Sequence, residues 1–363
     1  MASRSDLCNK IPHLSFARFV HVLENINMSL KKANFKVFLC LSCLLIFILY
    51  KILFLSYSST QFKYTIPNKT HKTDINSYNY NLMNEPNKIL CSNIKQPRSS
   101  TQRRLLFFIF IVTSPNQNTL RQTIRRTWAN YSSQIYNFKL VFTIGLSKKN
   151  KTNEMIKLEN EIHQDILQAN IYDSYNIITI KDMITLKWIN THCSNTHFIV
   201  KMADDVMANI HELVSYFQSK LNYKNTIFGR IALDQGPTRD PKYWQSYVTM
   251  EEFNGNLYEP FPSGTAFVIT NDLSESLYQY ALGFWAPPFS DRLDDVYIGM
   301  IAASLKTKFV DIRQSFVPEN HYLNISALEK IQLIKRNGVE KTFFVHAKEE
   351  QLEELWSFFY RND

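Results

Sequence analysis

Two adjacent acids follow directly after an apolar run in the stretch 198–206, which reads Phe-Ile-Val-Lys-Met-Ala-Asp-Asp-Val. Asp204 and Asp205 would then lie at the carboxyl end of a buried strand, where open α/β sheets bind their ligands. Adjacent carboxylates in that position can hold a hard divalent cation against a diphosphate. The pattern predicts an enzyme for a nucleotide-activated substrate, although two acids alone also fit a solvated turn.

Three further clusters contain residues capable of chemistry. Arg121 and Arg125 lie four positions apart, on one face of a predicted helix, and could grip phosphate. The alternative for this cluster is a helix that only braces the fold. Ser263 and Gly264 form a small turn that lets the backbone approach a ligand closely.

Trp244 precedes this Ser-Gly turn in the sequence. The last cluster is Asp294-Asp295, at the start of a predicted helix. Their carboxylates would be stabilised there by the helix dipole.

The elements that must position these residues alternate between strand and helix, which predicts an open α/β sheet with right-handed crossovers. The expected strands are 105–112, 139–144, 177–180, 197–200 and 266–270. The expected helices are 120–130, 154–169, 185–191, 210–221, 295–305 and 349–360.

Composition narrows the function classes. The chain has 363 residues and is 45% hydrophobic, which allows a packed core and excludes global disorder. The formal net charge of +9 suits an anionic substrate or membrane surface. No Lys/Arg run is interleaved with aromatic residues, so a nucleic-acid reader is excluded.

The N-terminal part predicts membrane anchoring. Residues 37–57 are almost entirely apolar and long enough to span a bilayer. Lys31, Lys32 and Lys36 precede this segment and favour a cytosolic tail, residues 1–36. A cleaved signal peptide and a buried core helix are the alternatives. We therefore expect a type II signal anchor, with the rest of the chain in a lumen.

Residues 58–102 are polar and aperiodic and predict a lumenal stem before a globular domain at 103–363. Cys91 and Cys193 would be the two lumenal thiols, either joined as a disulfide or buried as free thiols. Four N-x-S/T sequons are candidate glycosylation sites, at Asn68, Asn130, Asn150 and Asn324.

The four clusters, in this order, resemble the lumenal β-1,3-glycosyltransferases of the secretory pathway, the galactosyltransferase and N-acetylglucosaminyltransferase group related to Fringe. The matching motifs are Arg121-x-x-Ile-Arg125-x-Thr-Trp128, Lys201-x-x-Asp204-Asp205-Val-x-x-Asn209, Ser263-Gly264 and Asp294-Asp295-Val-Tyr-x-Gly299. His346, ten residues before Trp356, resembles the family's ending. The resemblance covers about 103–360.

The resemblance implies a GT-A-like nucleotide-diphosphosugar transferase domain with a mostly parallel mixed sheet. It also implies metal-dependent inverting transfer of a hexose from a UDP-sugar to a glycan acceptor in β-1,3 linkage, with galactose first and N-acetylglucosamine second. Asp205 and His346 would hold the metal, manganese by preference. Asp295 would be the base, with Asp294 as its neighbour.

By the same resemblance, the donor nucleotide would contact Arg121, Arg125, Lys201, Asp204 and Asp205. The acceptor or sugar pocket would contain Trp244, Ser263 and Gly264. The implied location is the Golgi membrane, with possible homo- or hetero-oligomers of glycosyltransferases. Ala203 departs from the family's run of three acids. The alternative function is therefore a catalytically silent relative that binds a glycan or a partner protein.

Overall fold

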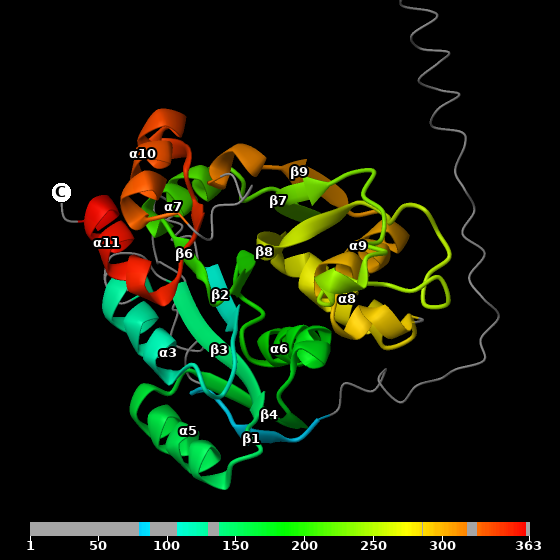
Figure 1. Cartoon of the computed structure of the whole chain (residues 1–363), viewed down its shortest axis with the longest axis horizontal. Coiled ribbons are helices and arrows are strands. Elements are labelled where there is room, and N and C mark those ends of the chain that lie inside the picture. Colours follow the sequence, from blue (N-terminus) through cyan, green and yellow to red (C-terminus); the bar gives the residue numbers. More distant parts are fainter. Residues whose placement is uncertain (1–79, 88–106, 130–137, 285, 318–324, 361–363) are drawn as a thin grey trace, which may run out of the picture. The chain divides into compact units, whose positions relative to one another are not determined.

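A computed structural model describes residues 80–87, 107–129, 138–284, 286–317 and 325–360 (Figure 1). The predicted tail, the apolar segment 37–57, Cys91 and the sequons at Asn68, Asn130 and Asn324 lie outside these ranges. Within the described ranges, no helix is both long and apolar enough to cross a membrane. The predicted signal anchor therefore stays a prediction.

The described residues are built around a mixed eight-stranded sheet with the strand order β1-β4-β3-β2-β5-β8-β7-β9. Its strands are β1 (Leu82–Asn84), β2 (Phe107–Val112), β3 (Phe138–Leu146), β4 (Ile166–Tyr172), β5 (Phe198–Ala203), β7 (Thr226–Ala232), β8 (Phe261–Thr270) and β9 (Lys308–Asp311). The helices are α3 (Asn118–Ile124), α5 (Asn150–His163), α6 (Ile178–His192), α7 (Ile210–Gln218), α8 (Asn271–Ala281), α9 (Asp294–Ser304), α10 (Ala327–Asn337) and α11 (Glu349–Tyr360).

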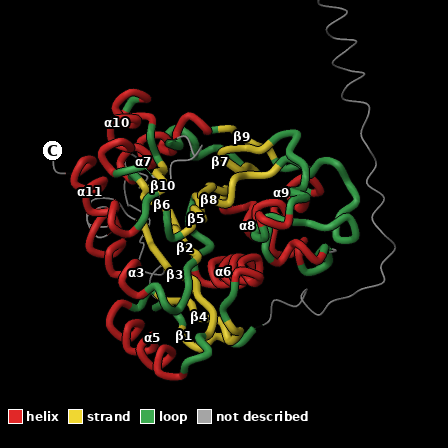
Figure 2. Tube along the Cα trace, viewed as in Figure 1, coloured by secondary structure: helices red, strands yellow, loops and turns green. Residues whose placement is uncertain are grey.

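Helices cover both faces of this sheet. Figure 2 shows the strands as a central band, with α3, α7, α10 and α11 on one side and α6, α8 and α9 on the other. Each side has its own buried apolar cluster. Because side chains of β2 and β5 point to both faces, these central strands read as continuous apolar runs in the sequence.

The central strands bring several chain segments to one edge of the sheet. β2 pairs in parallel with β5, with Val112 opposite Ala203, so residues 113 and 204 leave the sheet side by side. β8 runs antiparallel to β5, with Met202 opposite Ala266, which places Gly264 at the same edge. The pairing of β5 with β2 and with β8 thus determines which chain segments lie next to Asp204.

Helix α9 packs directly on β8. A Cβ atom on Gly299 would lie 2.4 Å from Phe261 Cβ and 2.7 Å from the Pro260 carbonyl oxygen. Only glycine allows helix and strand to approach this closely. The contact fixes the start of α9, and with it Asp294 and Asp295, beside Gly264.

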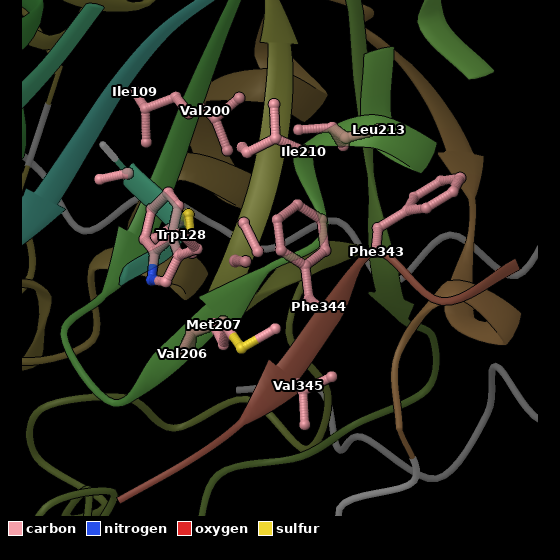
Figure 3. Close-up of a cluster of buried hydrophobic side chains, with 14 of the residues drawn as sticks. Ile109, Trp128, Val200, Val206, Met207, Ile210, Leu213, Phe343, Phe344 and Val345 are labelled. Carbon is pink, nitrogen blue, oxygen red and sulfur yellow. The ribbon is translucent and has the colours of Figure 1, made fainter. Parts of the chain in front are cut away.

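A second sheet connects the C-terminal part to the end of β5. Its strands β6 (Val206–Ala208) and β10 (Phe344–His346) are antiparallel, with His346 opposite Val206. Figure 3 shows Met207, Phe344 and Val345 of this sheet in one buried cluster with Trp128 and Ile109. The pairing places His346 next to Asp205, although the two residues are far apart in the sequence.

One predicted element was wrong in its extent and another in its type. The expected helix 154–169 is α5 followed by β4, so residues 166 and 167 lie in a strand. The expected strand 177–180 is the start of α6, a helix with buried side chains around most of its circumference. β-Branched residues favour strands locally, but burial between the sheet and α8 and α9 decides the outcome here.

The predicted boundary between stem and domain also needs correction. Residues 82–84 were placed in the stem, but they form β1 and pair with β4 at the sheet edge. Asn87 N–H donates to the Gln164 carbonyl oxygen at 3.1 Å, which ties the same segment to the domain. The folded domain therefore includes residues 80–87.

Gly299→Ala tests the contact between α9 and β8. We expect the variant to lower the free energy of unfolding by about 1–3 kcal/mol, because the added methyl group overpacks a buried contact. Chemical denaturation followed by circular dichroism measures the change. Gly283→Ala is the matched control, since its Cβ would meet nothing within 4 Å. Equal stability of the two variants would contradict the close-packing interpretation.

Candidate active site

A cavity of about 640 Å³ lies at the sheet edge where β2, β5 and β8 meet the start of α9. Its lining includes both acid pairs, Asp204-Asp205 and Asp294-Asp295, and also His346. A larger cavity of about 940 Å³ lies elsewhere, beside α7 and α10, and contains none of the predicted site residues. The chemistry predicted from the sequence therefore converges on the smaller cavity.

Asp204 is held at the end of β5 by the neighbouring strand. Thr113 Oγ1 donates to Asp204 Oδ2 at 2.5 Å. Burial raises the pKa of Asp204, and the charge of Asp205 acts in the same direction, against the Thr113 hydrogen bond. Lys181 Nζ donates to the Thr113 carbonyl oxygen and to Asp173 Oδ2, each at 2.9 Å. These contacts give Asp204 a fixed position at the cavity wall.

Asp205 faces the opening, with 46% of its side chain exposed. His346 Nε2 lies 3.0 Å from Asp205 Oδ2, and the Ala347 N–H donates to the Asp205 carbonyl oxygen at 2.8 Å. The structure thus brings together the two residues predicted as metal ligands. In the described part of the chain, no three His, Cys, Asp or Glu side chains are grouped as a metal site.

Asp294 is engaged by a buried lysine. Lys201 Nζ donates to Asp294 Oδ2 at 2.6 Å and to the Gly264 carbonyl oxygen at 2.9 Å. Lys201 is 3% exposed, so its charge interacts in a region of low dielectric constant. Asp294 and Gly264 therefore hold one ammonium group jointly, and this contact joins β5, β8 and α9.

Asp295 also lines the cavity, but its surroundings differ from those of Asp294. The Gly264 N–H donates to Asp295 Oδ2 at 3.1 Å, and the Val296 N–H donates to Oδ1 at 2.8 Å. Desolvation raises the pKa of Asp295 to about 6, and the charge of Asp294 acts in the same direction. Lys201 opposes this rise. A carboxyl group with this pKa is suited to accept a proton near neutral pH.

Arg121 and Arg125 occupy structural positions, which corrects their prediction as nucleotide ligands. Arg121 is fully buried and donates from Nε and Nη2 to the Glu159 carboxylate at 2.9 and 2.7 Å. Arg125 pairs with Glu159 and with Asp165, each at 2.7 Å. Neither arginine lines the cavity. Arg121 reaches it only indirectly, by donating to the Ser114 carbonyl oxygen at 2.7 Å.

Gln245 and Ser246 of the cavity lining come from the segment 233–260, which contains little regular structure. Arg239 donates to four backbone carbonyl groups, those of Val248, Thr249, Phe253 and Gly255. Arg292 donates to the Glu252 carboxylate at 3.1 and 3.0 Å. The two arginines give this long loop a defined conformation.

Aromatic side chains lie on this loop at the rim of the cavity. Trp244 is 61% exposed, and its ring packs against Tyr175 with centroids 5.5 Å apart and planes at 68°. Tyr175 lines the cavity, as do Ser263 and Gly264 from β8. Of the predicted acceptor residues, Ser263 and Gly264 therefore border the same space as the acids, whereas Trp244 is connected to it through Tyr175.

Two other predicted features fall in the described part. Cys193 is disulfide-bonded and buried, but the chain's other cysteines lie outside the described residues, so the pairing with Cys91 stays a prediction. Asn150 is exposed as the first residue of α5. Its side chain is accessible, and its glycosylation also stays a prediction.

Sequence reasoning missed Thr113, Lys181 and Arg292. Thr113 follows an apolar strand, as Asp204 does, so its position at the carboxyl end of β2 was a usable signal. The position of Lys181 on a helix could not be predicted, because the preceding residues, 177–180, have the sequence pattern of a strand. Nothing in the sequence pairs Arg292 with Glu252, since that contact depends on how the loop folds.

Known proteins show similarity to this chain over the same region. A sequence profile of the galactosyltransferase family matches residues 119–313, which is more than half of the chain. β-1,3-Galactosyltransferase 5 of mouse is 28% identical over 229 residues, covering 62% of this chain and 73% of the mouse protein.

Two further relatives are named for N-acetylglucosamine transfer. N-acetyllactosaminide β-1,3-N-acetylglucosaminyltransferase 2 of human is 30% identical over 235 residues, covering 63% of this chain and 55% of the human protein. Lactosylceramide 1,3-N-acetyl-β-D-glucosaminyltransferase of Xenopus tropicalis is 28% identical over 207 residues, covering 54% of each chain. The chain thus matches little more than half the length of these two relatives.

Solved structures show weaker similarity. Mouse xyloside xylosyltransferase 1 aligns with a TM-score of 0.32 and 12% identity, covering 67% of this chain and 98% of that protein. The bifunctional glycosyltransferase WbbM aligns with a TM-score of 0.36 and 12% identity, covering 73% of this chain and 50% of that protein. The profile match and the curated relatives confirm the predicted resemblance, and the chain belongs to the galactosyltransferase family.

Proposed function

We propose that this protein transfers a hexose from a UDP-sugar to a hydroxyl group of a glycan acceptor, with inversion and in β-1,3 linkage. Galactose is the first candidate sugar and N-acetylglucosamine the second. One observation carries the proposal: two acid pairs from distant segments line one cavity, and Asp295 in it has a pKa of about 6. The names of the relatives support the type of transfer.

The donor diphosphate would lie beside Asp205 and His346. Their carboxylate oxygen and imidazole nitrogen are ligands that suit manganese, and they lie 3.0 Å apart at the cavity wall. Phosphate oxygens and water would complete the ligand set. The bound cation would offset the negative charge that develops on the leaving UDP. Asp204 would then face the donor from its position at the end of β5.

Asp295 would act as the general base. The acceptor hydroxyl oxygen forms a bond to the anomeric carbon, the bond between that carbon and the diphosphate oxygen breaks, and the hydroxyl proton passes to Asp295. The N–H groups of Gly264 and Val296 orient the carboxylate for this role. Lys201 neutralises Asp294, so that only one acid of the pair carries unpaired charge toward the substrate.

The acceptor would bind at the aromatic rim. Sugar rings have apolar faces that pack on aromatic side chains, and the exposed ring of Trp244, supported by Tyr175, provides such a surface. Arg239 and Arg292 hold the loop that carries Trp244 in place. This arrangement favours a carbohydrate acceptor over a simple alcohol.

Ala203 supports a second candidate function. It lines the cavity at the end of β5, where the family pattern has a third acid. If that carboxylate is essential for binding the donor, this protein is a silent relative that binds a glycan or a partner protein. Under either function, we also propose that the protein is anchored in the Golgi membrane with a lumenal domain. We further propose that it forms homo- or hetero-oligomers.

Isothermal titration of UDP into the purified full-length chain, with manganese and then with a chelator, tests the donor site. We expect binding only with manganese, and Asp205→Ala should abolish it because one of two protein ligands is lost. Asp240→Ala is the matched control, since its side chain is also 46% exposed but lies outside the cavity. Failure of the folded wild-type protein to bind UDP would favour the silent relative.

Asp295→Asn tests the base. We expect the transfer rate to fall about 100- to 10,000-fold, because an amide cannot accept the proton, while manganese-dependent UDP binding persists. In the wild type, kcat/KM should rise as pH increases through about 6, since only ionised Asp295 accepts a proton. Asp291→Asn, outside the cavity, is the control. Normal turnover by Asp295→Asn would exclude this residue as the base.

Trp244→Ala tests the acceptor surface. The acceptor KM should rise about 2- to 12-fold, equivalent to about 0.5–1.5 kcal/mol of ring packing, with little change in donor affinity. Initial-rate kinetics with varied acceptor measure the effect. Tyr243→Ala is the control, because this neighbouring ring is similarly exposed but does not pack on Tyr175. Equal KM changes in both variants would argue against a specific role for Trp244.

A further inference from the structure

Asp182 is a buried acid that the proposed chemistry does not use. It lies on α6 with 0% exposure, and its carboxyl oxygens make no hydrogen bond of ordinary geometry among the described residues, although Asp294 is close enough to favour its protonated form. A buried polar group without partners costs free energy and is uncommon in folded proteins. Asp182 therefore needs an explanation other than stability.

The surroundings of Asp182 connect it to the active site. Asp182 and Lys201 line the same narrow, otherwise apolar cavity of about 10 Å³, beside Phe110, Ile199 and Phe267. Lys201 is the residue that holds Asp294 and the Gly264 carbonyl oxygen. Two acids, Asp182 and Asp294, thus share the neighbourhood of the Lys201 ammonium group.

The environment of Asp182 favours its protonated form. Desolvation raises the pKa of Asp182 well above 3.8, and Asp294 acts in the same direction, whereas Lys201 and Lys181 oppose the shift. With Asp182 protonated, the ammonium charge of Lys201 is balanced by Asp294. An ionised Asp182 would compete for the same charge.

We propose that Asp182 is a positioning residue, whose protonated form leaves Lys201 bound to Asp294 and Gly264 and whose ionised form draws Lys201 away from them. The Gly264 N–H donates to Asp295 at 3.1 Å, so a shift of Gly264 reaches the proposed base. The effect on Asp295 as a base rests on the proposed function. The pH-dependent change at Gly264 is a structural effect and does not rest on that function.

The charged and titratable groups around this network are few. Lys181 on α6, Lys201 on β5 and Asp294 on α9 act on Asp182. Asp294 and Lys201 act on Asp295. Tyr175 and Tyr258 interact electrostatically with Asp295, and burial raises the pKa of both phenols. Alkaline changes that come from these tyrosines would persist when Asp182 is replaced.

Nuclear magnetic resonance of the Gly264 amide tests the structural step. The chain contains eight glycines, so selective ¹⁵N-glycine labelling of the full-length protein in detergent gives few signals. In the wild type we expect one transition near pH 6 from Asp295 and a second from Asp182, whose pKa is raised well above the usual carboxyl value. Asp182→Asn should keep the first and lose the second. Persistence of both transitions in Asp182→Asn would overturn the proposal.

Thermal unfolding of the same proteins tests the buried acid without any substrate. In the unfolded chain Asp182 ionises near 3.8, whereas the native state keeps it protonated, so its contribution to stability falls as pH rises above that value. Asp182→Asn cannot ionise. Its folding equilibrium constant should therefore improve relative to wild type by up to about tenfold per pH unit between pH 4 and the native pKa.

Thr185→Val is the matched control for unfolding, because Thr185 is equally buried on α6 but does not titrate. Its effect on stability should be the same at pH 4 and pH 8. A pH-independent effect of Asp182→Asn as well would show that Asp182 is not a buried protonated acid, and would overturn the proposal.

If transfer activity is established, any decline of kcat/KM as Asp182 ionises should be smaller in Asp182→Asn than in the wild type. An identical decline in both proteins would overturn the link to the base. Absence of transfer activity would reject the proposed function alone, since the amide titration and the unfolding measurements do not depend on it.

Discussion

The buried ammonium group of Lys201 is the contact on which the active site depends. It joins β5 to α9 through Asp294 and to β8 through the Gly264 carbonyl oxygen, at 2.6 and 2.9 Å. A buried charge that loses its partner typically costs about 3–5 kcal/mol. The three elements therefore keep a fixed relation to one another, and the cavity between them keeps its shape.

The two acids of each pair lie in different environments. In the first pair, Asp204 is bonded to Thr113 at the wall, while Asp205 is exposed beside His346. In the second pair, Asp294 is neutralised by Lys201, while Asp295 faces the cavity with a raised pKa. Neighbouring residues of one type thus acquire different roles because their side chains leave the backbone toward different surroundings.

The role of the arginines is likewise decided by their surroundings. Arg121 and Arg125 have the charge and spacing of a phosphate site, but Glu159 and Asp165 engage them internally. Their contribution is to fix α3 and the segment at Ser114 against α5 and β4. In the loop 233–260, Arg239 and Arg292 hold backbone that lacks regular hydrogen bonding. The charges of these four arginines thus hold chain segments in place around the cavity.

The sequence by itself determined the α/β class, the central strands and the residue types of the site, because a strand buried on both faces gives an apolar run that ends at its functional acids. It also located α9 and α11 closely, because two acids open α9 and apolar residues recur along one face of α11. Local signals failed for β4 and for the start of α6. There, burial against other elements outweighs intrinsic preference.

Only the tertiary structure decided which charged groups meet. The antiparallel pairing of β6 with β10 brings His346 to Asp205, and the close packing at Gly299 brings Asp295 to Gly264. Whether Arg121 binds a ligand or Glu159, and whether Asp182 faces water or Lys201, likewise depends on contacts between distant segments. Charge and type are properties of a residue, but solvation and partners, which set its pKa and its role, are properties of the folded chain.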